Sequence, residues 1–257
     1  QNLPFLSLES LPKESIYQIL SHLKMKYRMR VRKCSTTMKE AIENSDLYAD
    51  QVTISFEWNQ RVHWTLFESV HKQYKLHAHH NDMHSLQNLL DNLSKSFRRV
   101  RMDKLKIYCN GMTLGHQHRI EQSTVDSLTA QFDFAGIHLK FDGIFQQTVM
   151  SFAIRSGRPI QYLALWNCDV DPPLVIGLPR TAILHVTQNG DGFSDAHALE
   201  IARREHTELQ LDRCNFIEPS TLRHLIKIFN SSHLMEILEL FVPSWYFDRF
   251  LASFGLR

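Results

Sequence analysis

The sequence is poor in the residues that interrupt regular structure or build special sites. Its 257 residues include only nine glycines and eight prolines, and its four cysteines, Cys34, Cys109, Cys168 and Cys214, are widely separated. Without a C-x-x-C pair, the chain offers neither a disulfide framework nor a zinc ribbon. No apolar run reaches the roughly 18 residues that a membrane helix needs. We therefore expect a folded protein with reduced thiols, in the cytoplasm, the nucleus or both.

The chain also lacks a dominant charge. Lysine and arginine total 29, against 27 aspartate and glutamate, for a formal net charge of +2. This balance does not indicate the strongly basic face that usually binds nucleic acid. Two basic clusters leave a nucleic-acid or lipid site open as an alternative, but we expect solvated helix faces; the clusters are Arg28, Arg30, Arg32 and Lys33, and Arg98, Arg99 and Arg101.

The N-terminal end lacks the charged and apolar regions of a signal peptide, and Gln1 is not an initiator methionine, which leaves room for residues upstream. Leu11-Pro12 suits a helix start, because proline fixes φ and lacks an N–H that the first turn does not use. Ser10 is expected to cap this helix. Its apolar stripe, at i, i+3, i+4 and i+7, is Ile16, Ile19, Leu20 and Leu23. A second helix is expected to carry Met29, Val31, Cys34, Met38, Ala41 and Ile42.

This stretch resembles the F-box, the three-helix motif that docks a substrate receptor onto the Skp-type adaptor of a cullin ubiquitin ligase. The residues on the first half of the family pattern are Leu11, Pro12, Glu14, Ile16, Ile19, Leu20 and Leu23, and those on the second half are Val31, Arg32, Cys34, Ser35 and Ile42. The resemblance implies adaptor contacts from Leu11, Pro12, Ile16, Ile19, Leu20, Leu23 and Val31. The alternative is an ordinary helical hairpin that covers the next domain.

The rest of the chain carries a degenerate repeat of the form L-x-x-L-x-L-x-x-N/C-x-L, whose period is 20–29 residues. Four segments fit, although His206 breaks the first position of the third: residues 102–112, 160–170, 206–216 and 235–245. Weaker candidates are Val52-x-Ile54, Tyr74-x-Leu76, Leu139-x-Phe141 and Leu184-x-Val186. Together they predict roughly eight strands, with apolar helices between them near residues 83–93, 198–202 and 222–229.

Strand, turn and helix, repeated, form the unit of leucine-rich-repeat proteins. We therefore predict an α/β fold: a three-helix F-box at residues 1–48, followed at residues 49–257 by a curved, leucine-rich-repeat-like solenoid with a parallel sheet. This organisation resembles F-box proteins with leucine-rich repeats, in particular the nematode-type F-box family. A generic α/β domain with a parallel sheet is the alternative.

In such a fold the residues between the buried leucines line a concave face that binds a target protein. The predicted target-binding residues are Lys104, Lys106, Tyr108, Tyr162, Trp166, His185, Gln210 and Phe241. The aromatic ones are the expected anchors, because aromatic side chains supply large contact areas at low entropic cost. The basic early strands suggest a partner with an acidic segment. Alternatively, Trp166 packs beneath a loop.

The sequence predicts no enzyme and no cofactor, since no catalytic or phosphate-binding motif frames its Ser, Cys or His residues. His77, His79, His80 and His84 invite a zinc site, but no nearby pattern completes one, and a solvated turn is favoured.

The predicted function is substrate recognition in an SCF-type ubiquitin ligase. Its partners would be a Skp-type adaptor, through it a cullin, and a target protein, with no membrane or nucleic acid. The alternatives are a non-ligase scaffold or inhibitor, and an enzyme that uses the histidine-rich segment.

Overall fold

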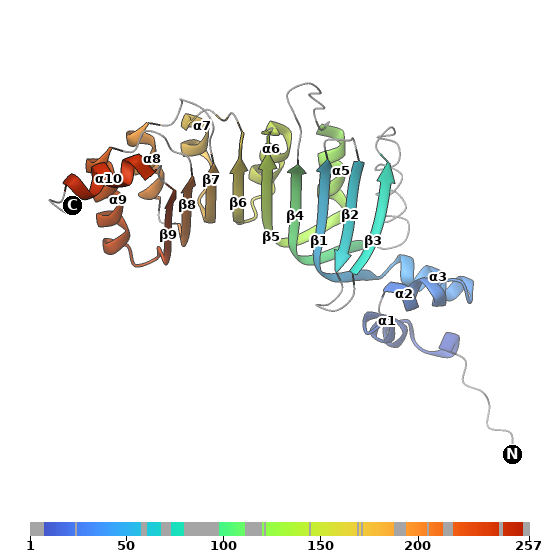
Figure 1. Cartoon of the computed structure of the whole chain (residues 1–257). Coiled ribbons are helices and arrows are strands. Elements are labelled where there is room, and N and C mark those ends of the chain that lie inside the picture. The colour runs from blue at the N-terminus through green and yellow to red at the C-terminus, as the bar shows by residue number, and fades with distance from the viewer. Residues whose placement is uncertain are drawn as a thin grey trace, which may run out of the picture. The chain divides into compact units, whose positions relative to one another are not determined.

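The computed structural model describes most of the chain: residues 8–23, 25–57, 61–67, 73–79, 98–110, 120, 122–143, 145–168, 170, 172–187, 194–204, 206–212, 218–241 and 244–253. Figure 1 shows its helices and strands. The chain divides into two compact units. The first comprises Gln1–Ile54, Gln60–Leu105 and Glu121–Ala135, and the second comprises Ser55–Asn59, Lys106–Ile120 and Gly136–Arg257.

The N-terminal module, in the first unit, contains η1 (Leu8–Ser10), α1 (Lys13–Ser21), α2 (Met25–Val31) and α3 (Thr36–Glu43). Helix α1 begins directly after Pro12, where the missing proline N–H leaves no helical hydrogen bond unmade. The prediction that Ser10 caps this helix is wrong, because Ser10 ends η1. Helices α1 and α2 both contact α3, and Ile16, Leu20, Met38 and Ile42 supply buried apolar side chains.

The predicted second helix is two helices, α2 and α3. Ser35 separates them with an extended backbone, φ −161°. Its hydroxyl accepts a hydrogen bond from the Met38 N–H at 3.2 Å, so Ser35 caps the start of α3. The periodicity of apolar residues missed the break because both helices bury residues in one shared core.

The first unit also contains a β-hairpin. It is formed by β2 (Arg61–Phe67) and β3 (Gln73–His79), which pair antiparallel with Trp64 opposite Leu76. The expectation that Tyr74-x-Leu76 continues a parallel series is therefore wrong. The physical reason is the short connection of residues 68–72, since a parallel crossover needs a dozen or more residues. The helix predicted at 83–93 lies outside the described residues.

Nine strands of the described chain are hydrogen-bonded in the order β3-β2-β1-β4-β5-β6-β7-β8-β9, and seven of them form a parallel sheet. The early elements are β1 (Asp46–Glu57), β4 (Arg99–Asn110), α5 (Gln122–Gln131) and β5 (Phe132–Asp142). The later ones are α6 (Gln147–Arg155), β6 (Ile160–Trp166), α7 (Pro172–Gly177), β7 (Thr181–Thr187), α8 (Asp195–Ala202), β8 (Glu208–Asp212), α9 (Pro219–Ser231), β9 (Ile237–Phe241) and α10 (Ser244–Ser253). The helices predicted near 198–202 and 222–229 are confirmed as α8 and α9.

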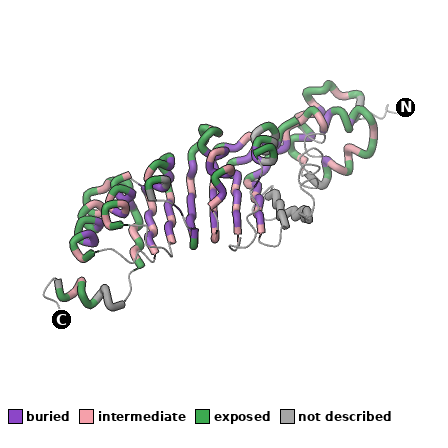
Figure 2. Tube along the Cα trace, turned by 90° about the horizontal axis from the view of Figure 1, so that it is seen from above, coloured by how far each residue is buried: buried purple, intermediate pink, exposed green. Residues whose placement is uncertain are grey.

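In the second unit, the apolar positions of neighbouring strands lie in register. The first row is Leu139, Leu163, Leu184, Leu209 and Leu238, at spacings of 24, 21, 25 and 29 residues, and the second is Phe141, Leu165, Val186, Leu211 and Leu240. Both rows are buried from β5 to β8 and half-buried in β9, and Figure 2 shows the alternation along the strands. The weak strand candidates at 139–141 and 184–186 are thus confirmed as strands. A leucine-rich-repeat solenoid remains a prediction.

His206 occupies the first position of its repeat as a buried polar side chain whose Nδ1 is hydrogen-bonded and whose Nε2 has no hydrogen-bond partner among the described residues. The residue is only 2% exposed, and its Nδ1 donates a hydrogen bond to the backbone oxygen of Thr181 at 2.8 Å. Ile160, Thr181 and Met235 stand at the matching positions of the neighbouring repeats and are also buried. Burial of the imidazole lowers the pKa of His206 below its ordinary value of 6.5.

We expect His206 to make the fold sensitive to acid. The unfolded chain takes up this proton at a higher pH than the folded chain, so the stability from neutral His206 is present above 6.5 and is lost as pH falls toward the lowered folded pKa. In His206→Asn, whose amide can still donate to Thr181, the midpoint of urea denaturation should fall less between about pH 7.5 and 5.5. Replacement of the exposed His233 by Asn is the control. Equal acid loss in wild type and His206→Asn would contradict the assignment.

Candidate protein-binding surfaces

The first candidate surface is the outward stripe of α1. Pro12, Ser15 and Ile19 follow one another at i, i+3 and i+7, which places them along one side of the helix. Pro12 is exposed, and Ile19 is 37% exposed. Leu8 and Tyr27, on the neighbouring elements, are further exposed apolar side chains of the module. An exposed apolar stripe on a small helical module is suited to a protein partner.

The structure separates the predicted adaptor-binding residues into three groups. Pro12 and Ile19 are exposed, while Leu11, Leu23 and Val31 are half-buried. Ile16 and Leu20 are buried within the first unit and contribute to its core. The accessible part of the predicted set is therefore Pro12 and Ile19 with the edges of the half-buried residues, and the contacts themselves stay a prediction.

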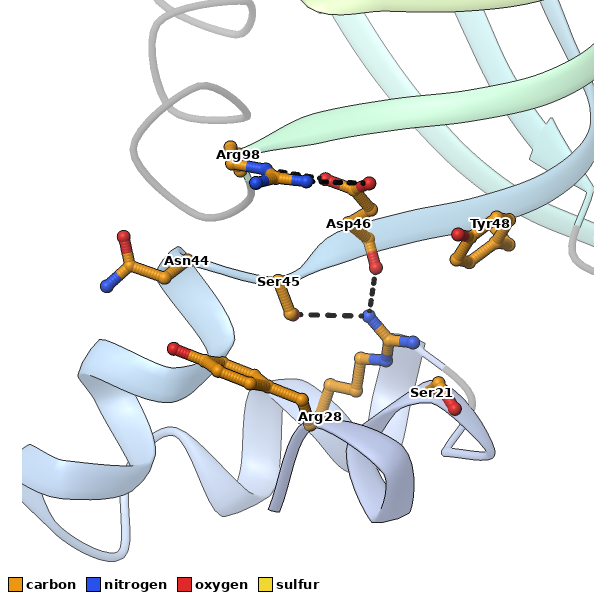
Figure 3. Close-up of a pocket in the computed structure, with 8 residues that line it drawn as sticks. Ser21, Arg28, Asn44, Ser45, Asp46, Tyr48 and Arg98 are labelled. Atoms are coloured by element: carbon orange, nitrogen blue, oxygen red, sulfur yellow. Dashed lines mark hydrogen bonds and ion pairs between the residues drawn. The ribbon is translucent and has the colours of Figure 1, made fainter. Parts of the chain in front are cut away.

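The buried guanidinium of Arg28 joins α2 to the start of β1 (Figure 3). Arg28 is 1% exposed. Its Nε donates to the backbone oxygen of Leu23 at 3.0 Å, and Nη1 donates to that of Asp46 at 2.7 Å. Nη1 also lies 3.5 Å from the Ser45 hydroxyl. A buried cation is tolerated only when hydrogen bonds replace its hydration, and the carbonyls supply them here.

The carboxylate of Asp46 holds two further arginines, of which Figure 3 shows Arg98. Arg98 donates to both of its oxygens, at 3.0 and 3.2 Å. Arg101 Nε lies 2.9 Å from Oδ2, and its guanidinium lies 5.9 Å from the Tyr48 ring centroid. The hydrogen bond and charge of Asp46 raise the pKa of Arg98. Asp46 therefore contacts the helical module through its backbone oxygen. Its carboxylate contacts Arg101 of β4 and Arg98, the residue just before β4.

These contacts correct the expectation that residues 28–33 form a solvated basic face. Arg28 is a core residue, and Arg32 pairs with Glu43 of α3 at 2.5 Å. Arg30 alone of these three arginines is exposed, with its guanidinium 5.9 Å from the Tyr27 ring centroid. The acidic partners of this cluster therefore include groups within the chain itself.

An open pocket of about 480 Å³ lies beside Arg28, Asp46 and Arg98 (Figure 3). Its lining consists of Tyr17, Ser21, Arg28, Asn44, Ser45, Asp46, Tyr48 and Arg98. Arg28, Asp46 and Arg98, which line this pocket, are hydrogen-bonded to groups of the chain itself. We therefore interpret these residues as structural, holding the helical module in place, and not as a charged ligand site.

The second candidate surface is the face of the parallel sheet opposite the leucine rows, within the second unit. We call it the open face. It carries the side chains that alternate with the leucines: His138, Lys140, Asp142, Tyr162, Ala164, Trp166, Ile183, His185, Thr187, Glu208, Gln210, Asp212, Ile237, Glu239 and Phe241. All but the buried Ala164 are half-buried or exposed. The predicted residues Tyr162, Trp166, His185, Gln210 and Phe241 therefore lie on this face.

The predicted residues on β4 also alternate with buried ones. Lys106 and Tyr108 are half-buried between Leu105, Ile107 and Cys109, and Lys104 of the first unit is exposed. Burial raises the pKa of Tyr108. Their accessibility agrees with a binding role, and that role remains a prediction.

Tyr162 belongs to a polar line across four strands, β5 to β8. Its ring stacks on His138 with centroids 5.7 Å apart and meets His185 edge-on at 5.2 Å. His185 Nε2 lies 2.6 Å from Glu208 Oε1 and must donate there, so Nδ1 is left to accept from the Tyr162 hydroxyl at 3.5 Å. Burial, helped by the negative charge of Glu208, raises the pKa of Tyr162. Sequence reasoning missed Glu208 and His138, because only the register brings them beside Tyr162.

Trp166 lies at the end of β6 with a lysine over its ring. Lys140 Nζ is 3.8 Å from the ring centroid, a close cation–π contact. Ala164, opposite Lys140 in the register, is fully buried between these larger side chains. Trp166 itself is half-buried. The indole is therefore held in place and retains accessible surface, which favours the expected anchor role.

Two cysteines of the described chain, Cys109 and Cys168, are buried beneath the surface. Both are free thiols, and burial raises both pKa values, that of Cys168 to about 12. A thiol must ionise to attack or to bind metal, so both residues are suited to packing. Among the residues that the structure describes, no three His, Cys, Asp or Glu side chains group as metal ligands. His80, His84 and Cys214 lie outside them.

The comparisons with known proteins concern the N-terminal module. Residues 8–50 match the F-box domain. This match supports an F-box protein with a role in binding the adaptor of an SCF-type ubiquitin ligase; F-box proteins are in general adaptor or receptor subunits. No curated protein matches the chain. In the described part of the chain, no helix has the length and apolarity to cross a membrane.

Arg28→Met should lower the free energy of unfolding by about 2–4 kcal/mol, because the Leu23 and Asp46 carbonyls lose buried charge-assisted hydrogen bonds. Arg30→Met, on the exposed side of the same helix, should change it by less than about 0.5 kcal/mol. Urea denaturation measures both. Equal stability of the two variants would show that Arg28 does not hold the module.

Proposed function

We propose that the chain is the substrate-recognition subunit of an SCF-type ubiquitin ligase. The observation that carries the proposal is the F-box match at residues 8–50 on a module whose α1 exposes Pro12 and Ile19. F-box domains typically bind Skp-type adaptors. The adaptor would then connect the chain to a cullin, in the cytoplasm or the nucleus.

The open face would bind the target protein. Its support is the combination of Tyr162 and Trp166, two large aromatic side chains that neighbours hold in fixed positions. Aromatic anchors of this kind contribute most to interfaces, because little side-chain entropy remains to be lost on binding. Lys106 and Tyr108, in the same unit, would extend this surface, and a target contact from Lys104 of the first unit stays a separate prediction.

The mechanism would be proximity. A receptor that holds its target beside a ubiquitin-charged enzyme raises the effective concentration of the acceptor lysine. Such a role requires no catalytic residue and no cofactor in this chain. It requires two surfaces that act independently, one in the helical module and one on the sheet.

Ile19→Lys should abolish capture of a Skp-type adaptor, since it replaces the exposed isoleucine of the α1 stripe with a charged side chain. The matched control is Ile154→Lys on α6, where the isoleucine is 47% exposed. Co-purification of the tagged chain with recombinant adaptor measures the effect. If the wild-type chain captures no adaptor, the ligase proposal fails and a scaffold outside any ligase becomes the better explanation.

Trp166→Ala should weaken target capture about tenfold or more while adaptor capture is unchanged. Affinity purification followed by quantitative mass spectrometry reports both partners in one experiment. Tyr48→Ala, which removes an exposed aromatic side chain from the first unit, serves as the control. Loss of adaptor and target together in Trp166→Ala would indicate unfolding and would contradict separate binding surfaces.

A further inference from the structure

The last strand, β9, presents apolar side chains where a folded chain usually presents polar ones. Ile237 is 43% exposed and Phe241 is 50% exposed. They alternate with Leu238 and Leu240, so they lie on the open face with Glu239 between them. Leu238 and Leu240 are half-buried on the leucine side. The open face thus ends in the order apolar, acidic, apolar.

The neighbouring strand adds negative charge to the same patch. In the register, Glu208 lies opposite Ile237 and Asp212 lies opposite Phe241, with the neutral Gln210 opposite Glu239. Neither β8 nor β9 contributes a lysine or arginine to this part of the face. Glu208 is bound by His185. We call the group Glu208, Asp212, Ile237, Glu239 and Phe241 the β9 patch.

The β9 patch differs in charge from the other end of the open face. Lys106 and Lys140 lie on β4 and β5 with one carboxylate, Asp142, whereas three carboxylates and no lysine or arginine lie on the open face of β8 and β9. Electrostatic complementarity favours a partner with positive charge at the β9 end. A negatively charged partner would repel these carboxylates, and both would lose water without gaining an ion pair. The two exposed apolar side chains require apolar partners on either side of that charge.

We propose that the β9 patch binds an extended segment of the target in which two apolar side chains flank a lysine or arginine, with one residue between each. Side chains two apart in an extended chain share a face and are about 6.6 Å apart, the spacing of Ile237, Glu239 and Phe241. The basic group pairs with Glu239, and the apolar groups cover Ile237 and Phe241. This inference rests on the proposed function, since it assigns the segment to the target.

The test uses the full chain and a fluorescein-labelled peptide in which leucine, arginine and leucine alternate with serine. Fluorescence anisotropy measures its Kd. Phe241→Ser and Glu239→Lys should each weaken binding about tenfold. The control is Ile226→Ser on α9, which likewise removes an exposed apolar side chain and should leave the Kd of the peptide unchanged. A peptide with glutamate in place of arginine should bind Glu239→Lys better than wild type.

Recovery by this charge exchange supports the proposal, because an unfolded variant could not regain binding. Equal binding by wild type and both patch variants overturns it, as does failure of the charge exchange. Sedimentation showing a dimer that Phe241→Ser dissociates would also overturn it, since a second copy would then occupy the patch. Adaptor capture by the wild-type chain separates the two ideas: its absence refutes the ligase role, whereas a wild-type chain that captures the adaptor but does not bind the peptide refutes the segment.

Discussion

The register of the parallel strands is the constraint on which the second unit depends. Leu163, Leu184 and Leu209 stand side by side, so each strand buries the same alternate positions as its neighbour. A shift by one residue would move every leucine to the opposite face and expose it. Because the buried rows are fixed, the residues between them are fixed too, and Tyr162 meets both His138 and His185. The arrangement of side chains on the open face is thus a consequence of core packing.

In the first unit, the buried hydrogen bonds of Arg28 fix the helical module to the sheet. The helical module is too small for a large core of its own, and Arg28 attaches it to β1 through the backbone oxygen of Asp46. The Asp46 carboxylate in turn holds Arg98 and Arg101. A charge buried in this way is costly without all its partners, which makes the attachment specific in geometry. The exposed residues Pro12 and Ile19 take no part in this attachment.

Periodicity predicted the elements well where burial follows it. The L-x-L segments predicted strands even where the match was weak, as at Leu184, and proline marked the start of α1 at Pro12. The hairpin of β2 and β3 was missed because strand direction depends on connection length, which the alternation of apolar residues does not encode. Arg28 was misread for a similar reason: a basic helix predicts solvent exposure, and only the carbonyls of Leu23 and Asp46 make burial possible. Glu208 and His138 became visible as site residues only through the register.

The protein has two candidate binding surfaces with different physical origins, the exposed stripe of α1 and the open face of the sheet. The central proposal is that the adaptor binds the α1 stripe and leaves the open face accessible. Hydrogen–deuterium exchange of the full chain, with and without a recombinant Skp-type adaptor, tests this most directly. The account predicts slower exchange in α1 and no change in β6, β7 and β8. Protection of those strands by the adaptor, or no protection of α1, would contradict it.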